Sequence, residues 1–248
     1  MRRLSIELVP RNRESVEREA RWIQEHCAQV DTINVPDLAR FTLRSWEAIA
    51  ITKQHVSRGI PHLRARDLRA DDLPELVATL AEHRIREVVV INGEPRPDDD
   101  EEGMYPDEAI AALKHVAPTL RIYAALDPYC RTMQDEMTRM REKLSAGADG
   151  FFTQPFFDLR LMSIYMDLAP EAPVFWGVSP VLRERSRRYW EKTNRVVFPR
   201  DFEPSLEWNI DFARRAMGLV SEVGGNLYLM PIRTKLEDYL GPLLGESS

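Results

Sequence analysis

A glutamate stands inside the first apolar run of this chain, in a position where a carboxyl group could do acid–base chemistry. Glu7 lies between Ile6 and Leu8 in the run LSIELVP. A carboxyl group in apolar surroundings has a raised pKa and can hold a proton near neutral pH, so Glu7 is a candidate general acid. The structural alternative is an ion pair between Glu7 and an arginine such as Arg64 or Arg233.

A glutamine interrupts the aromatic stretch GADGFFTQPFFD, residues 147–158. If this stretch is a buried strand, the amide of Gln154 needs hydrogen-bond partners, because burying it without them costs roughly 1–3 kcal/mol. We therefore expect Gln154 to meet a polar partner.

Polar residues also stand late in, or just after, most of the other apolar runs. Any one of them could be a satisfied core group or a solvated strand end, but their recurrence favours a shared site. His62 stands early in its run and is by default a structural hydrogen-bonding residue. Lys143 stands late in a helical segment, where a solvated helix end is the alternative to a binding role. The remaining residues of this kind are Asp37, Arg64, Arg66, Asp67, Asn92, Glu94, Asp127, Ser179 and Arg233.

Several common site motifs are missing from the sequence. The five histidines are scattered without an HxH or HExxH pattern, and Cys27 and Cys130 form no CxxC pair, so no metal site is expected. There is no GxSxG turn and no P-loop, and no GxGxxG follows the first run. Serine hydrolysis, P-loop phosphoryl transfer and dinucleotide binding of the Rossmann type therefore lack a motif.

The composition is that of a globular protein with a small-molecule partner. The chain has 248 residues and a net charge of −6, which lacks the basic footprint of a nucleic-acid-binding protein. No run has the length of a membrane span, and the opening MRRLSIELVPRN has no apolar signal-peptide core. We expect no nucleic-acid or membrane partner and a cytoplasmic location, which two isolated cysteines also fit. Homo-oligomerisation is left open by the sequence.

Short apolar runs alternate along the chain with segments of helical period. Segments 15–27, 71–83, 106–116 and 133–147 have apolar residues three and four positions apart, and Gly147 is placed to end the last of them. The alternation predicts one α/β domain over residues 1–248, closed as a (β/α)8 TIM barrel, with an open doubly wound sheet as the alternative. The predicted strands are residues 4–10, 30–36, 61–66, 86–92, 121–127, 150–156, 174–180 and 226–232.

Such a barrel carries its chemistry at the carboxyl ends of the strands, which is where the polar residues are expected to meet. An additional helix that begins near Pro204 is predicted before the last strand. The five consecutive carboxylates at 98–102 repel one another and predict an exposed loop after the fourth strand.

The runs resemble, in the same order, the catalytic barrel of the methylenetetrahydrofolate reductase family. The most specific piece is AGADGFFTQPFFD, which is similar to the family's AGAD-x-x-x-TQ-x-FFD segment. SIELVP is similar to the family's S-x-E-x-x-P first strand, and PHL to its third-strand A/P-H-L-T-C. INGEPRPD stands where the family has LRGDPP, and LYLMPIR where it has HFYTLNR.

The resemblance implies an oxidoreductase that interconverts 5,10-methylenetetrahydrofolate and 5-methyltetrahydrofolate by hydride transfer through bound FAD, with NADH or NADPH as a transient donor. A tetrahydrofolate derivative is then the partner. Glu7 would be the general acid that opens the five-membered ring, and Glu94, Gln154 and Arg233 would bind the substrate. The implied FAD-binding positions are His62, Asn92, Gly93, Glu94, Tyr105, Pro106, Glu136 and Lys143.

The chain departs from the family at several implied flavin contacts. LRGD reads INGE, which puts Asn92 in place of an arginine, and Pro36 replaces a threonine after the second strand. HLTC reads HLRA, which places Arg64 near the site. Each lost hydrogen bond is worth about 0.5–1.5 kcal/mol, so a few together weaken flavin binding roughly a hundredfold. The alternative function is therefore a flavin-independent folate-binding barrel, acting as a methyltransferase component or carrier subunit. A barrel enzyme unrelated to folate is the third candidate function.

Overall fold

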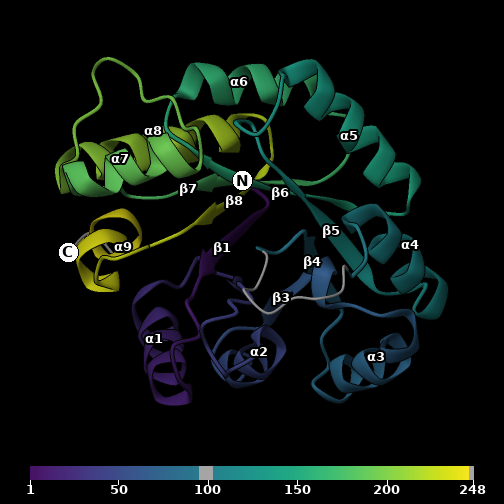
Figure 1. Cartoon of the computed structure of the whole chain (residues 1–248). Coiled ribbons are helices and arrows are strands. Elements are labelled where there is room, and N and C mark those ends of the chain that lie inside the picture. Colours follow the sequence, from purple (N-terminus) through teal and green to yellow (C-terminus); the bar gives the residue numbers. More distant parts are fainter. Residues whose placement is uncertain (95–102, 246–248) are drawn as a thin grey trace.

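Eight parallel strands close into a barrel in the order β1 to β8 (Figure 1). A computed structural model describes residues 1–94 and 103–245, so the acidic run at 98–102 lies outside the described residues. The first and last strands pair, with Leu4 opposite Leu227, which confirms the predicted TIM barrel and excludes the open sheet. The strands are β1 Arg3–Glu7, β2 Thr32–Val35, β3 Arg58–Arg64, β4 Glu87–Ile91, β5 Arg121–Leu126, β6 Gly150–Phe156, β7 Val174–Val178 and β8 Asn226–Leu229.

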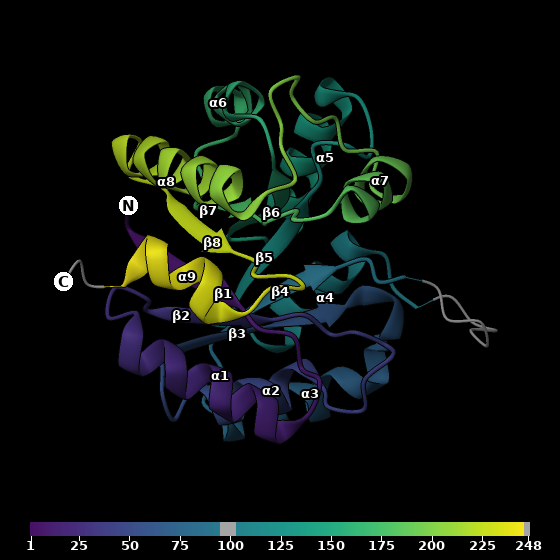
Figure 2. The same cartoon turned by 90° about the vertical axis from the view of Figure 1, so that its left-hand side faces the viewer.

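Helices surround the strands, with α1 to α3 on one side and α5 to α8 on the other (Figure 2). The predicted extra helix is α8, which begins two residues after Pro204, and Gly147 follows α5 with a positive φ of 109° as predicted. The helices are α1 Arg13–His26, α2 Ser45–Thr52, α3 Leu73–Glu82, α4 Pro106–Val116, α5 Met133–Ser145, α6 Leu159–Leu168, α7 Glu184–Thr193, α8 Leu206–Glu222 and α9 Leu236–Leu244.

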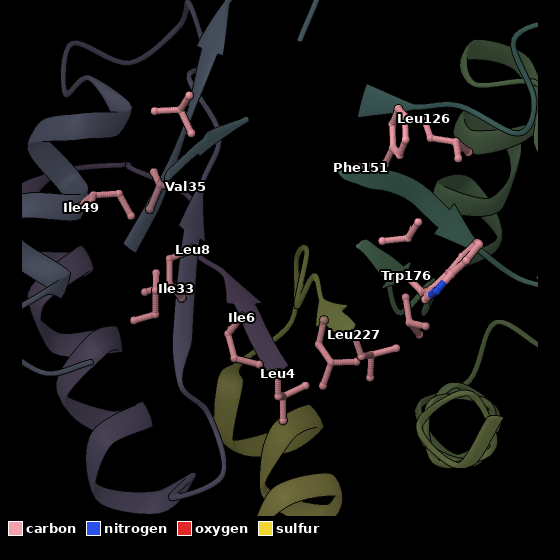
Figure 3. Packing of buried hydrophobic residues seen from close by; sticks show 14 of the residues in the cluster. Leu4, Ile6, Leu8, Ile33, Val35, Ile49, Leu126, Phe151, Trp176 and Leu227 are labelled. Carbon is pink, nitrogen blue, oxygen red and sulfur yellow. The ribbon is translucent and has the colours of Figure 1, made fainter. Parts of the chain in front are cut away.

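Alternate strand residues build two separate apolar layers. One layer lies between strands and helices, where Ile49 of α2 lies beside Val35 of β2 (Figure 3). The other fills the barrel interior, where the rings of Phe152 and Phe175 stack with centroids 4.2 Å apart. The barrel is therefore a packed core and not a pore, as its side-chain layers require. The interior cluster consists of Ile60, Val89, Tyr123, Phe152, Phe175, Tyr228 and Met230.

A polar network occupies the interior at the amino ends of the strands. Arg3 forms an ion pair with Glu87 at 2.6 Å and donates to the hydroxyl of Thr32 at 2.9 Å. The hydroxyl of Tyr123 donates to the same Glu87 carboxylate at 2.9 Å. With this end occupied, the carboxyl ends of the strands are left as the place where a ligand can meet inward-facing side chains.

The third strand begins earlier than the sequence predicted. β3 starts at Arg58, which pairs with Thr32 of β2, and the chain turns into a short 3-10 helix, Ala65–Asp67, where the prediction continued the strand. His62 therefore lies in the second half of β3, and its expected position early in the strand is wrong. The added residues of β3 move His62 toward the carboxyl end of the barrel.

Replacing Gly177 of β7 with alanine should destabilise the protein, because the new Cβ would lie 2.7 Å from a ring carbon of Tyr228. Overpacking of this kind costs about 1–3 kcal/mol of unfolding free energy. Gly218 of α8 is the matched control, since a Cβ there meets nothing within 4 Å and should add about 0.5–1 kcal/mol. Urea unfolding of Gly177→Ala and Gly218→Ala measures both changes in unfolding free energy. Equal midpoints would contradict the described packing of Tyr228.

Candidate active site

Strands β1, β2 and β3 bring three polar side chains together inside the carboxyl end of the barrel. The Nδ2 atom of Asn34 donates to Oε2 of Glu7 at 3.1 Å and lies 3.2 Å from Nε2 of His62. The hydroxyl of Ser5 donates to Oδ1 of Asn34 at 2.7 Å. Glu7 and His62, both predicted from sequence, are thus linked through one buried amide.

The carboxyl group of Glu7 titrates near neutral pH. Burial raises its pKa to about 7, and the hydrogen bond from Asn34 opposes part of that rise. Within the described residues, no arginine takes up the ion-pair alternative, and Arg64 pairs with Asp67 at 3.1 Å. The neighbouring phenol of Tyr228, whose hydroxyl donates to the carbonyl of Thr153, has a pKa raised by its burial and by the charge of Glu7.

His62 is a neutral imidazole at this site. Burial lowers its pKa to about 3, so the ring carries no charge at physiological pH. Its ring lies edge-on to Phe152, with centroids 6.3 Å apart, and its backbone carbonyl accepts from the hydroxyl of Ser45 at 2.6 Å. The ring therefore sits between the aromatic core and the mouth of the barrel.

The ends of β3 and β4 bring Asn92, Gly93 and Glu94 next to the buried Arg64. Nη2 of Arg64 donates to the backbone carbonyl of Glu94 at 2.6 Å, and Nε of Arg64 forms an ion pair with Asp67. Gly93 has a positive φ of 87°, and a Cβ there would lie 3.1 Å from the Cβ of Arg64. A side chain at position 93 would thus be strained and crowded, while Asn92 and Glu94 are exposed.

Gln154 is exposed, so the expectation that it needs a partner to offset burial is wrong for the protein without ligand. The strand pairing of β6 with β7 shifts register between Phe152 and Pro155, and this irregularity sets Gln154 apart from its buried neighbours. Thr153 is buried instead, and its hydroxyl accepts from the backbone N–H of Gly177 at 2.8 Å. The amide of Gln154 keeps its contact with water and is available to a ligand.

Two side chains of α5 hydrogen-bond to the carboxyl end of β5. Lys143 bonds to a residue within β5, and Glu136 bonds to the residue that follows the strand. Glu136 is buried and accepts from the backbone N–H of Asp127 at 3.0 Å. Lys143 donates to the carbonyl of Ala125 at 2.6 Å, and its burial lowers its pKa. The structure therefore gives both side chains partners within the protein.

Tyr105 and Arg233 lie on connecting segments, and Pro106 begins a helix. Tyr105 is 59% exposed and precedes α4, whose first residue is Pro106, and its N–H donates to Glu108 at 2.9 Å. Arg233 is exposed between β8 and α9 in a left-handed conformation with φ of 56°, which is uncommon for a residue with a side chain. Among the described residues, no ion pair or hydrogen bond engages the Arg233 side chain.

Asn34 and Ser5 were not predicted from the sequence as members of the site. Both are fully buried polar residues within apolar runs, two positions from Pro36 and Glu7 respectively. The sequence feature that could have predicted them is a spacing of two, because strand residues two positions apart face the same side of the sheet. They do not stand at the ends of the predicted strands, where site residues were expected.

The described residues offer neither a metal site nor a membrane-spanning helix. Over residues 1–94 and 103–245, no group of three or more His, Cys, Asp or Glu side chains is arranged to hold a metal ion. In the same ranges no helix combines the length and apolar character that crossing a bilayer requires. A groove of about 520 Å³ between α1 and α9 includes none of the candidate residues in its lining.

Together the fold and this site define a TIM-barrel protein with a buried polar cluster at the carboxyl ends of its first three strands. A sequence model of the family described as methylenetetrahydrofolate reductase matches residues 13–223, which is most of the chain. The chain belongs to the methylenetetrahydrofolate reductase family.

Curated relatives agree with the family at low identity. The 5,10-methylenetetrahydrofolate reductase of Escherichia coli (strain K12) is 25% identical over 142 residues, which cover 54% of this chain and 48% of that protein. The enzyme of the same name from Pectobacterium carotovorum subsp. carotovorum is 28% identical over 102 residues, covering 40% of this chain and 34% of that protein. The matched region thus spans about half the length of these relatives or less.

Solved structures show the same fold at still lower identity. A 2,3-dimethylmalate lyase superposes with a TM-score of 0.61 at 12% identity, covering 97% of this chain and 76% of that chain. A phosphonopyruvate hydrolase gives a TM-score of 0.52 at 14% identity, covering 90% of this chain and 83% of that chain. These likenesses concern the barrel alone.

Replacing Glu7 with glutamine should make the protein more stable at neutral and alkaline pH. The folded pKa of about 7 lies above the ordinary 4.5, so between these pH values the carboxyl group stays protonated in the folded protein but ionises in the unfolded chain, and stability falls as the pH rises. Glu7→Gln should match the wild type near pH 4 and exceed its unfolding free energy by about 3 kcal/mol above pH 7. Urea unfolding across pH measures this, with the exposed Glu25→Gln on α1 as control. A pH-independent difference would contradict the raised pKa.

Proposed function

We propose that this protein is an oxidoreductase that interconverts 5,10-methylenetetrahydrofolate and 5-methyltetrahydrofolate, with Glu7 as the general acid. The observation that carries the proposal is the half-buried carboxyl group of Glu7, whose pKa of about 7 leaves both protonation states populated near neutral pH. Family membership and the name of the Escherichia coli relative support the choice of a folate substrate.

The role of Glu7 follows from the chemistry of the methylene form. Protonated Glu7 gives its proton to a nitrogen of the five-membered ring, and the bond between that nitrogen and the one-carbon unit breaks. The one-carbon unit is left as an iminium on the other nitrogen, and one hydride converts it into a methyl group. In the oxidising direction the carboxylate of Glu7 takes the proton back, so one residue serves both directions.

Three exposed side chains around the mouth are proposed to bind the substrate. Gln154 at β6 offers an amide that both donates and accepts, which suits the heteroatoms of a pterin. Arg233 after β8 offers a cation for the carboxylates of the folate tail. Glu94 after β4 is the acidic group proposed to lie beside the pterin.

Part of the mouth fits the polar edge of a flavin, which when bound would supply the hydride and be reduced in turn by NADH or NADPH. His62 presents a neutral ring, and the positive φ of Gly93 leaves no side chain on the backbone there. Asn92 and Glu94 contribute exposed polar groups, and Tyr105 and Pro106 stand at the start of α4.

The fit is incomplete at two of the proposed FAD-binding residues. Glu136 and Lys143 would contact the cofactor only by sharing the hydrogen bonds that they already make with Asp127 and the carbonyl of Ala125. This favours modest flavin affinity.

A second candidate function is a folate-binding barrel without its own flavin, acting as a methyltransferase component or carrier subunit. The observation that favours it is Arg64, which packs against Gly93 and bonds the carbonyl of Glu94. A buried arginine in this place occupies space next to the proposed flavin positions. The two candidates share Glu7, Gln154 and Arg233 and differ in the cofactor.

Glu7→Gln should lose most turnover and keep substrate binding, because it removes the proton donor and preserves the shape. General acid catalysis contributes about 10²–10⁴-fold, so we expect kcat to fall by at least about a hundredfold. In the wild type, reduction of the methylene form should decline above pH 7, where Glu7 is deprotonated. Steady-state kinetics across pH test both, with Glu25→Gln as the matched surface control. Full activity in Glu7→Gln would remove the mechanism.

An absorption spectrum of the purified protein, recorded with FAD added back, separates the two candidates. The flavin-dependent enzyme should show a flavin band that bleaches with NADH or NADPH and recovers with 5,10-methylenetetrahydrofolate. A colourless protein that ignores FAD and still binds 5-methyltetrahydrofolate would establish the flavin-independent barrel.

A further inference from the structure

The buried amide of Asn34 has all of its hydrogen-bonding groups engaged. An amide offers two N–H donors and one carbonyl acceptor. Oδ1 accepts from Ser5, and Nδ2 faces both Oε2 of Glu7 and Nε2 of His62. Turning the amide over would point its oxygen at Oε2 of Glu7, which is electrostatically unfavourable when that carboxylate is ionised. The ionised carboxylate therefore fixes the orientation of Asn34.

We infer that Asn34 is a positioning residue that holds His62 in the tautomer protonated at Nδ1 and directs the acidic proton of Glu7 to Oε1. The part concerning Glu7 rests on the proposed function, whereas the part concerning His62 does not.

The tautomer of His62 follows from which nitrogen accepts. An Nε2 atom that accepts an N–H from Asn34 carries no proton, so the neutral ring must carry its proton on Nδ1. Among the described residues no hydrogen bond uses Nδ1, and the backbone carbonyl of the same residue accepts from Ser45. His62 thus keeps an N–H on Nδ1 without a protein partner there, which favours a ligand atom that accepts.

The proton of Glu7 is placed by the same amide. In a protonated carboxyl group the carbonyl oxygen is the better acceptor, and Asn34 donates to Oε2. The proton therefore belongs on Oε1, which no hydrogen bond engages within the described part of the chain. Asn34 keeps this proton away from the amide and free for transfer to a ligand.

The first test is nitrogen-15 NMR of the five histidine rings in the folded protein without ligand. Subtraction of a His62→Gln spectrum assigns the His62 signals, which should show protonated Nδ1 and unprotonated Nε2 from pH 5 to 8. Asn34→Asp keeps the side-chain shape but has no donor, so we expect the proton to move to Nε2. His55, whose Nδ1 bonds Gln24 at 2.8 Å on the surface, is the internal reference and should not change.

The possible results distinguish a wrong tautomer of His62 from a wrong proposed function. A proton on Nε2 of His62 in the wild type, or an unchanged tautomer in Asn34→Asp, would overturn the assignment of the tautomer. If Asn34→Asp fails to fold, Asn34→Leu gives the same comparison, because it also removes the N–H that Nε2 of His62 accepts and should produce a mixture of tautomers. An unaltered single tautomer in Asn34→Leu would then overturn the assignment. A protein that shows the expected tautomer but does not turn over folates refutes the proposed function alone.

The second test reads the proton of Glu7 by infrared spectroscopy at pH 5, where the carboxyl group is protonated. The difference between wild type and Glu7→Gln isolates its C=O stretch. Because the carbonyl oxygen accepts from Asn34, the band should shift to higher frequency in Asn34→Leu, which has no donor. A band that does not move would refute the placement of the proton on Oε1.

Discussion

Successive residues of a strand point to opposite faces, and in a closed barrel one of those faces is an enclosed interior of limited width. Everything that this chain places inside must therefore fit into layers. An ion pair fills the layer at the amino ends, stacked aromatic rings fill the middle, and the amide of Asn34 with its neighbours fills the layer at the carboxyl ends. The depth of each side chain, and with it its access to water, follows from its position along the strand.

The aromatic layer sets the chemistry of the layer above it. Phe152 lies against both Tyr228 and the ring of His62, and Tyr228 fastens β8 to β6 through the carbonyl of Thr153. This apolar surface removes water from below Glu7 and His62, which is why the pKa of the carboxyl rises while that of the imidazole falls. Both groups are held in their uncharged forms over part of the pH range by one physical cause.

Much of the fold could be predicted because local pattern determines it: eight apolar runs and the helical segments between them are properties of neighbouring residues. Glu7 could be predicted for the same reason, since its apolar neighbours adjoin it in sequence. The role of Asn34 could not, because its three partners come from two other strands. The exposure of Gln154 depends on how β6 pairs with β7, and the position of His62 depends on where β3 begins to pair with β2. Such features require the register of the assembled sheet.

The ion pair between Arg3 and Glu87 joins β1 to β4 across the interior, although two other strands separate them around the ring. The two charges meet inside the barrel only when the sheet has curled, and β1 acquires its second neighbour only when β8 docks beside it. Contacts between residues so distant in sequence are slow to form. An incompletely closed sheet would leave both charges partly desolvated without their partners. Closure is thereby coupled to charge neutralisation, which makes assembly of the barrel cooperative and disfavours partly open intermediates.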